Sequence, residues 1–495
     1  MSSSRFSPKR DDRTSFEPVP PFALFYQLTY MSAMAAAGLS RSKTFEIAAR
    51  SGSSAARYFA AINTLVDEFR YDYPEACRRI GVQAKSENMR SFLLRLSDAL
   101  RSGEPLAEFL AREAEVQAAD YENKYERSLE SLKQWSNAFS SIVISVALIV
   151  IIQVISSMIY SMNTQVMTGL ISTGVIMASF GAWIIWRSAP REAMTVPPSQ
   201  GSQEQKRALS LFRTLLPLAL AIALVLHLAG VPLGWNLILV AALMLPSGAM
   251  GLLSDRRTTK KDEEFSTFLR STGGMATSSG TTLREALTKI DLSSFPTLQP
   301  EIARLSTRLQ ALVPPELCWH KFGLESGSRL IADVTGIFYG AVKTGGDPER
   351  VGYLCSLFAA KTTQLRAKRR LVAGTFAGLT TVMQAVVAAL MIFVLSIVNN
   401  FAELVAELMP TGEAAAEGQA QMNMAMASFT PGELQFLSTI TVSMILLLAT
   451  IGALAAIAAD GGLKIKTTFY LAVTTLISGV CLLIVPPLVD RILTI

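Results

Sequence analysis

The sequence has few of the residues that enzymes use for acid–base chemistry and metal binding. Its 495 residues include 2 histidines and 4 cysteines. His227 and His320 are isolated, and the cysteines lack metal-like spacing, so no zinc site, Ser–His–Asp or Cys–His arrangement is predicted. The Gly-x-x-x-x-Gly-Lys-Ser/Thr loop that cradles nucleotide phosphates is also missing. We therefore expect a protein that is not an enzyme, needs no cofactor or metal, and depends on a partner for any ATP hydrolysis.

Charged residues are also scarce. They make up 17% of the chain, against about a quarter in ordinary soluble proteins. Hydrophobic residues make up 50%, and the mean hydropathy is +0.36. The net charge of +6 is not a nucleic-acid signal, because no basic surface interleaved with aromatic residues is visible. The composition indicates an integral membrane protein with large polar parts.

Seven apolar stretches, with Arg213 at the edge of one of them, reach the length of about 20 residues that a bilayer core requires. They lie near residues 140–160, 166–186, 212–230, 235–253, 374–398, 434–459 and 468–489. Four of them separate two polar blocks, and an even number of spans places both blocks on one side of the membrane. The predicted fold class is therefore all-α: a polytopic membrane protein with about seven transmembrane helices and two cytoplasmic helical-bundle domains.

The side of the membrane on which the two blocks lie follows from the distribution of Lys and Arg, which resist transfer across the bilayer. The connections expected outside, 161–165, 231–234 and 399–433, contain neither residue. We expect a multi-pass protein of the cytoplasmic membrane with a cytoplasmic N-terminus and an external C-terminus. The predicted parts are a disordered cytoplasmic tail (1–21), a first helical domain (22–138), four transmembrane helices (139–253, with a cytoplasmic loop at 187–211), a second helical domain (254–373), and three transmembrane helices (374–495, with an external acidic loop at 399–433).

The two polar blocks are copies of each other. Gly38 and Gly103 are 65 positions apart, and so are Gly280 and Gly345, at a constant offset of 242. These glycines end apolar helical patterns, amphipathic ones before Gly103 and Gly345, and a left-handed residue commonly ends a helix. Each block is predicted to be two antiparallel helical hairpins.

Each block runs into the membrane without an obvious break. No proline or glycine interrupts residues 106–135, and the first span begins about five residues later. In the second copy only Gly352 lies between Pro348 and the next span. Continuous helices that couple each block rigidly to the membrane are therefore predicted.

Several sequence segments resemble the type II secretion system F domain. They are Phe25–Ala33 followed by Gly38-Leu39-Ser40-Arg41, then Ser102–Leu106, and in the second copy Phe268–Arg270 with Ser279–Leu287. Typical bacterial members have one span between the two domains and about three in all, whereas four and seven are predicted here. That layout is similar to archaellum platform proteins, with the platform of an adhesive type IV pilus or secretion system as the alternative.

The resemblance implies a non-enzymatic platform for the assembly, and the rotation, of a filament. Its partners would be a hexameric cytoplasmic ATPase and the filament subunits that are drawn from the membrane. The small-xxx-small pattern of Gly374 and Gly378 is compatible with a homodimer. A transporter would be expected to keep ionisable groups at mid-membrane, and apart from His227 the spans have none. A membrane sensor without a filament is the remaining alternative.

Two groups of residues are candidates for function. Basic residues that flank the spans could bind anionic lipid headgroups or dock the ATPase. They are Arg256, Arg257, Lys260, Lys261, Lys361, Arg366, Lys368, Arg369 and Arg370. Residues of the turns could face a partner or could simply form the turns. They are Gly38, Gly103, Glu104, Pro105, Gly280, Gly345, Asp347 and Pro348.

Overall fold

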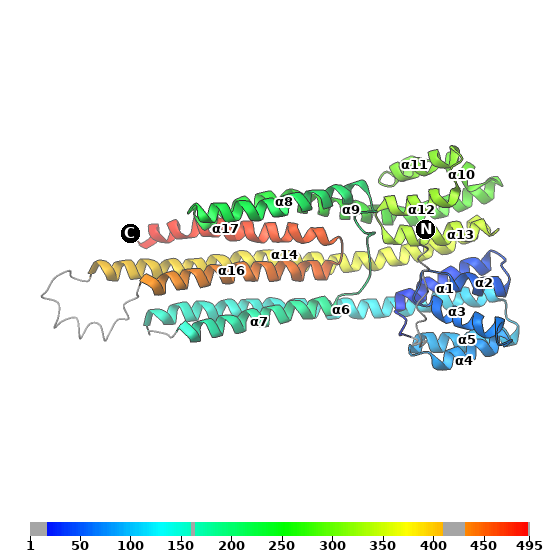
Figure 1. Ribbon diagram of the computed structural model, residues 1–495, viewed down its shortest axis with the longest axis horizontal. Coiled ribbons are helices and arrows are strands. Elements are labelled where there is room, and N and C mark those ends of the chain that lie inside the picture. The colour runs from blue at the N-terminus through cyan, green and yellow to red at the C-terminus, as the bar shows by residue number, and fades with distance from the viewer. Residues whose placement is uncertain (1–16, 160–163, 409–430, 494–495) are drawn as a thin grey trace, which may run out of the picture.

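The computed structural model describes residues 17–159, 164–408 and 431–493, which form an elongated helical molecule (Figure 1). Long helices form a bundle, and shorter helices gather at one end of it. Within the described ranges the only β-pairing is one isolated bridge, between Thr195 and Ser328. The predicted all-α class is confirmed.

Seven of the described helices are long and apolar enough to cross a membrane. They are α6 (Leu106–Ile159), α7 (Thr164–Ser188), α8 (Gln203–Leu228), α9 (Leu233–Ser279), α14 (Pro348–Leu408), α16 (Pro431–Asp460) and α17 (Thr467–Leu493). Their outward faces are apolar: Leu220, Leu224 and Val225 on α8 are each more than 60% exposed. Such a surface is unfavourable in water and favourable against lipid tails. The protein is a multi-pass membrane protein.

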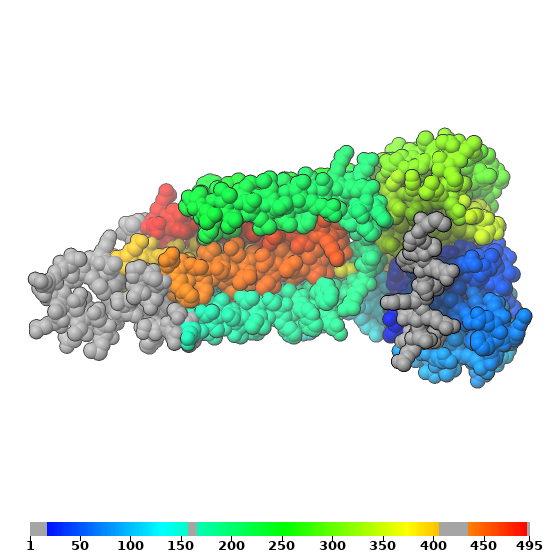
Figure 2. All heavy atoms as spheres, viewed as in Figure 1, coloured from blue at the N-terminus to red at the C-terminus, as the bar shows by residue number. Residues whose placement is uncertain are grey.

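Module 1 comprises five short helices and the first part of α6. The short helices are α1 (Pro21–Ala36), α2 (Arg41–Ala49), α3 (Ala56–Asp67), α4 (Tyr73–Gln83) and α5 (Glu87–Ser102). Module 2 has the same order: the last part of α9, then α10 (Leu283–Lys289), α11 (Gln299–Gln310), α12 (Pro315–Ser326), α13 (Arg329–Lys343) and the first part of α14, with a short 3₁₀ turn, η1 (Leu292–Ser294). Figure 2 shows the modules as two adjacent lobes at the same end of the bundle.

The duplication extends to backbone conformation. Gly38, Gly103, Gly280 and Gly345 all have positive φ, as the helix-end pattern predicted. Among the described residues only Arg70 and Leu312 are non-glycine residues with positive φ, at 59° and 60°. They too are 242 positions apart, in the α3–α4 and α11–α12 turns. The expectation of two hairpins per module missed the helices on either side of these turns, α3 and α4 in module 1 and α11 and α12 in module 2, because no glycine marks the turn between them.

Three helices run unbroken from the modules into the bundle. Helix α6 has 54 residues and α14 has 61, which corresponds to about 80 and 90 Å at 1.5 Å per residue. The predicted continuity across both boundaries is confirmed. Helix α9 behaves in the same way with 47 residues, although a domain boundary was expected inside it, after residue 253.

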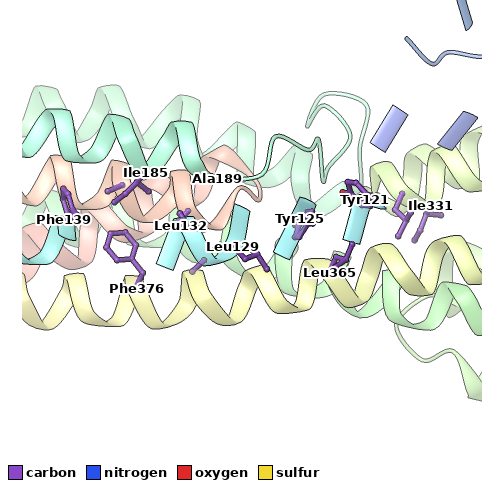
Figure 3. Packing of buried hydrophobic residues seen from close by; sticks show 14 of the residues in the cluster. Tyr121, Tyr125, Leu129, Leu132, Phe139, Ile185, Ala189, Ile331, Leu365 and Phe376 are labelled. Carbon is purple, nitrogen blue, oxygen red and sulfur yellow. The ribbon is translucent and has the colours of Figure 1, made fainter. Parts of the chain in front are cut away.

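The two modules differ in how their cores join the bundle. Module 1 has its own core, which includes Phe45, Phe59 and Phe92. The core of module 2 is continuous with the α6–α14 seam and with the bundle. Figure 3 shows part of this seam, where Tyr121 and Leu365 lie on facing helices. Helix α1 belongs to both cores, because its two faces are buried on opposite sides.

Candidate functional site

The α6–α14 seam brings the two copies face to face. Lys361 pairs with Glu122, and Lys368 pairs with Glu126, with a longer contact of 3.8 Å from Lys368 to Glu122. Glu126 and Lys368 are separated by 242 positions, which is the repeat offset. Contact between equivalent positions is what a two-fold relation between two copies produces. The seam is therefore the meeting face of the duplicated modules.

Apolar contacts reinforce the seam through α1. The rings of Phe25 and Phe358 are 4.5 Å apart, and Phe25 and Tyr121 are 6.0 Å apart. Phe25 and Phe358 are less than 5% exposed. Aromatic pairs at these separations add to the gain from burial. Module 1 is thus held against α14 as well as against its own long helix.

A buried charge network lies where the long helices pass from the modules into the bundle. Arg366 on α14 contacts Glu192 at 2.6 Å and Asp262 on α9 at 2.9 Å. All three side chains are at most 7% exposed. Removing one partner of an ion pair this deeply buried is strongly destabilising, because it leaves an uncompensated charge in the protein interior. Arg366 therefore ties the α7–α8 connection to α9 and α14.

A second set of contacts continues the same layer. Lys466 contacts Asp255 on α9 at 2.8 Å and also pairs with Asp460 at the end of α16. The guanidinium of Arg369 donates to the carbonyls of Ala459 at 2.9 Å and Pro190 at 2.7 Å. A cation at a helix C-terminus is favourable because the last carbonyls carry partial negative charge. Glu192, Asp255, Asp262, Arg366, Arg369, Arg370, Asp460 and Lys466 are called the junction network below.

The connection between α7 and α8 is part of this assembly. It was expected to be a cytoplasmic loop, and in the structure it lies against module 2. The N–H of Val196 donates to the carbonyl of Gly327 at 3.1 Å, and the N–H of Arg329 donates to that of Met194 at 3.1 Å. The side chain of Gln205 also donates to Gly327, at 3.0 Å. The connection therefore fastens the bundle to module 2.

Most of the basic candidates contact groups of this chain. Lys361, Lys368, Arg366, Arg369 and Arg370 belong to the seam or to the junction network. Two others form ion pairs near the start of α8: Arg257 with Glu204, and Lys261 with Glu301 at 3.1 Å. Arg256 and Lys260 are exposed and form no hydrogen bond or ion pair with the described residues.

The acidic partners were missed by sequence reasoning. Asp255 and Asp262 are two helical turns apart on α9, and Arg366 and Arg369 are one turn apart on α14. Carboxylates with this spacing fall on one face of a helix. That regularity is a usable signal for charge pairing between two helices. Glu192 gives no such signal, because it lies in an irregular connection.

Two of the four candidate turns contact each other. The Gly38 turn meets the Gly345 turn, since a Cβ on Gly346 would lie 2.7 Å from that of Ala37. Nothing within 4 Å would obstruct a Cβ on any of the four turn glycines themselves, Gly38, Gly103, Gly280 and Gly345. Glu104, beside Gly103 and Pro105, pairs with Arg112.

Asp347 caps α14, whose first residue is Pro348. Its carboxylate accepts hydrogen bonds from the hydroxyl of Thr277 at 2.7 Å and from the N–H of Arg350 at 3.2 Å. The Thr277 hydrogen bond, followed by the backbone N–H groups, holds the pKa of Asp347 below its usual value. The side chain thus joins the end of α9 to the start of α14.

Catalytic or metal chemistry has no visible support in the described ranges. No group of three or more His, Cys, Asp and Glu side chains there could hold a metal ion. His227 and His320 are both exposed and lie on different helices. Burial raises the pKa of the Cys77 thiol to about 12, so it is an unreactive core residue.

The fold and these contacts define a class: a polytopic helical membrane protein with two copies of a helical module joined to its bundle by continuous helices. Residues 28–154, which run from α1 through most of α6, match the family described as type II secretion system (T2SS), protein F. This part of the chain is thus similar to the type II secretion system F family, the family that the sequence resemblance indicated.

Two curated relatives, both called flagella accessory protein J, are similar to the chain. The protein from Methanocaldococcus jannaschii is 27% identical over 320 residues, which cover 62% of this chain and 56% of the relative. The protein from Methanococcus voltae is 23% identical over 331 residues, which cover 64% and 59%. The similarity thus spans less than two thirds of either relative's length. No solved structure matches the chain.

Proposed function

We propose that this protein is the membrane platform on which an archaellum is assembled and rotated. The observation that carries the proposal is the fusion of two equivalent modules to one bundle by the unbroken helices α6 and α14. The names of the two curated relatives support the archaellum as the filament. The platform itself is not an enzyme in this proposal, and a hexameric cytoplasmic ATPase supplies the energy.

In this proposal the ATPase moves the modules, and the long helices carry that movement into the membrane. A continuous helix transmits tilt or rotation, whereas a flexible linker would absorb it. The junction network prevents α9, α14 and α16 from sliding past one another where the movement enters the bundle. Filament subunits in the membrane would respond to the rearranged bundle.

The residues that face the partners are also part of the proposal. Gly103, Glu104 and Pro105 form one turn at a module end, and Gly345, Asp347 and Pro348 form the equivalent turn. Glu104→Lys and Asp347→Lys should each weaken binding of the ATPase and reduce filament formation. Unaltered binding and filament formation in both variants would remove these turns from the interface.

The N-terminus is proposed to be cytoplasmic and the C-terminus external, with both modules in the cytoplasm. Single cysteines at Ser102 and Thr344 test the modules, and a cysteine at Gly230, in the α8–α9 turn, tests the other end. A membrane-impermeant maleimide should label position 230 in intact cells, and positions 102 and 344 only after permeabilisation. Labelling of either module in intact cells would contradict the orientation.

The platform is proposed to act as a homodimer. Gly374 and Gly378 are exposed on α14, and nothing lies within 4 Å of the place where a Cβ would be. Small residues on such a face permit close approach of a second helix in the membrane. Gly374→Leu with Gly378→Leu should shift a cross-linked dimer to monomer, and an unchanged dimer would exclude this face.

A deletion strain that is scored for swimming and for surface filaments tests the function. Complementation with the full chain should restore both swimming and archaella. Loss of adhesive pili with normal swimming would instead favour the platform of an adhesive type IV pilus. Normal swimming and normal filaments in the deletion strain would overturn both.

Helical coupling has its own test in the same strain. Lys133, Gln134 and Asn137 are exposed on α6 between module 1 and the membrane. A triple substitution to Gly costs about 1 kcal/mol of helix stability per site, whereas the matched triple substitution to Ala costs none. The Gly variant should lose filaments at normal protein level while the Ala variant keeps them. Equal swimming of the two variants would argue against coupling through α6.

A further inference from the structure

A polar pocket lies beside the start of α8, where α8, α9 and the N-terminal part of α11 meet. Its volume is about 470 Å³, and its lining includes five basic and two acidic side chains. The basic ones are Arg207, Arg257, Lys260, Lys261 and Arg304, and the acidic ones are Glu204 and Glu301. We propose that this pocket binds the phosphate group of an anionic membrane lipid. The inference needs only the membrane placement of α8 and α9, and does not rest on the platform function.

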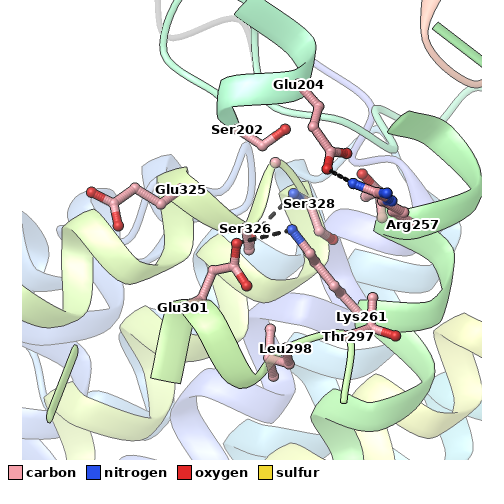
Figure 4. A network of polar contacts seen from close by, with 12 residues as sticks. Ser202, Glu204, Arg257, Lys261, Thr297, Leu298, Glu301, Glu325, Ser326 and Ser328 are labelled. Carbon is pink, nitrogen blue, oxygen red and sulfur yellow. Dashed lines mark hydrogen bonds and ion pairs between the residues drawn. The ribbon is translucent and has the colours of Figure 1, made fainter. Parts of the chain in front are cut away.

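The acids of the pocket are already neutralised within the chain. Glu301 accepts from Lys261 at 3.1 Å and from Arg304 at 3.0 Å. Glu204 pairs with Arg257 (Figure 4). The lining therefore keeps a surplus of three positive charges. A surplus of this kind in a concave site attracts anions, because the field of several cations adds within it.

Two of the basic side chains are available to a ligand. Arg207 on α8 and Lys260 on α9 are exposed and have no hydrogen bond or ion pair with the described residues. Arg257 is 61% exposed although it is paired. An arginine fork together with a lysine suits phosphate oxygens, since arginine can donate two parallel hydrogen bonds and lysine acts as a compact charge.

The pocket also lies at the depth of lipid headgroups. Arg207 is five residues before Phe212, where the apolar part of α8 begins, and Lys260 is seven residues after Leu253 on α9. These separations correspond to about 8 and 10 Å along the helices at 1.5 Å per residue. Basic pockets at such boundaries bind anionic headgroups.

An apolar surface for the acyl chains lies farther along the same two helices, beyond the pocket. Leu253 is 51% exposed, and Leu220 and Leu224 on α8 are 62% and 61% exposed. Only 6% of the most apolar stretch of α8 is buried inside the protein. Lipid tails can therefore lie along α8 and α9 while the phosphate occupies the pocket. This continuity favours a lipid over a soluble phosphate compound as the ligand.

The test uses the full chain in neutral detergent micelles and a fluorescent phosphatidylglycerol as the probe. Unlabelled phosphatidylglycerol, phosphatidylcholine and inorganic phosphate serve as competitors. The test variant is Arg207→Gln with Lys260→Gln. Its matched control is Lys206→Gln with Arg256→Gln, which removes the same charge from exposed neighbours that do not line the pocket.

We expect saturable binding that phosphatidylglycerol displaces and phosphatidylcholine does not. The test variant should weaken binding about 30-fold, which corresponds to two basic contacts of about 1 kcal/mol each. The control should change it less than threefold. Displacement by millimolar inorganic phosphate, with the same loss in the test variant, would support the anion site but assign it to a soluble phosphate compound. Equal binding by both variants, or no preference over phosphatidylcholine, would overturn the proposal.

Discussion

Replacing Arg366 tests whether the junction network holds the long helices together. Its guanidinium contacts Glu192 at 2.6 Å and Asp262 at 2.9 Å, and the three side chains are at most 7% exposed. Arg366→Met fills a similar volume but leaves two buried carboxylates without their cation. Removing one partner of a buried ion pair costs about 3–5 kcal/mol. The variant should therefore lose at least that much of its free energy of unfolding.

A control and a rescue separate this mechanism from general damage. Arg370 is 39% exposed and lies 3.7 Å from Asp255, so Arg370→Met should cost less than about 1 kcal/mol. Adding Glu192→Gln and Asp262→Asn to Arg366→Met removes the orphaned charges, and most of the lost stability should return. The measurement is reversible unfolding of the purified chain in mixed micelles. Equal loss in both arginine variants, or no recovery in the triple variant, would refute the reasoning.

Two further predictions concern the point where α9 meets the start of α14. A Cβ on Gly273 would lie 2.3 Å from the carbonyl oxygen of Pro348, so Gly273→Ala should lower the free energy of unfolding by about 1–3 kcal/mol in a thermal unfolding assay. The control is Gly274→Ala, which should be neutral or stabilising because no atom lies within 4 Å of its Cβ position. Equal melting temperatures would show that the two helices do not approach this closely. Asp347→Ala should cost about 0.5–2 kcal/mol at pH 7 as the loss of a helix cap. Because hydrogen bonding to Thr277 lowers the pKa of Asp347, the stability that this side chain contributes is present above about pH 4 and is lost as the pH falls further. A loss of stability in Asp347→Ala that is independent of pH would contradict the charged cap.

The features that the sequence predicted are those with local causes. Gly38, Gly103, Gly280 and Gly345 have the left-handed conformation because each ends a helix, and a helix end is marked by neighbouring residues. The continuity of α6 was readable because nothing in residues 106–135 could interrupt a helix. The duplication was readable because it repeats these local marks at a constant offset.

The features that the sequence did not predict depend on distant partners. Arg366 looked like a surface residue that flanks a span, yet it is buried against Glu192, which is 174 positions away. No local pattern specifies that approach, which is decided by how the α7–α8 connection folds back onto module 2. The middle helices of each module were missed because residues such as Arg70 and Leu312 take a conformation that is usual for glycine.

Amide hydrogen exchange across residues 130–140 of the purified protein tests the central claim most directly. That claim is that module 1 is joined to the membrane bundle by a rigid, unbroken helix. Leu132 and Phe139 are at most 1% exposed in the seam, so these amides should exchange as slowly as those of the module core. Rapid exchange in this segment, with slow exchange on either side, would show a hinge and would contradict the account.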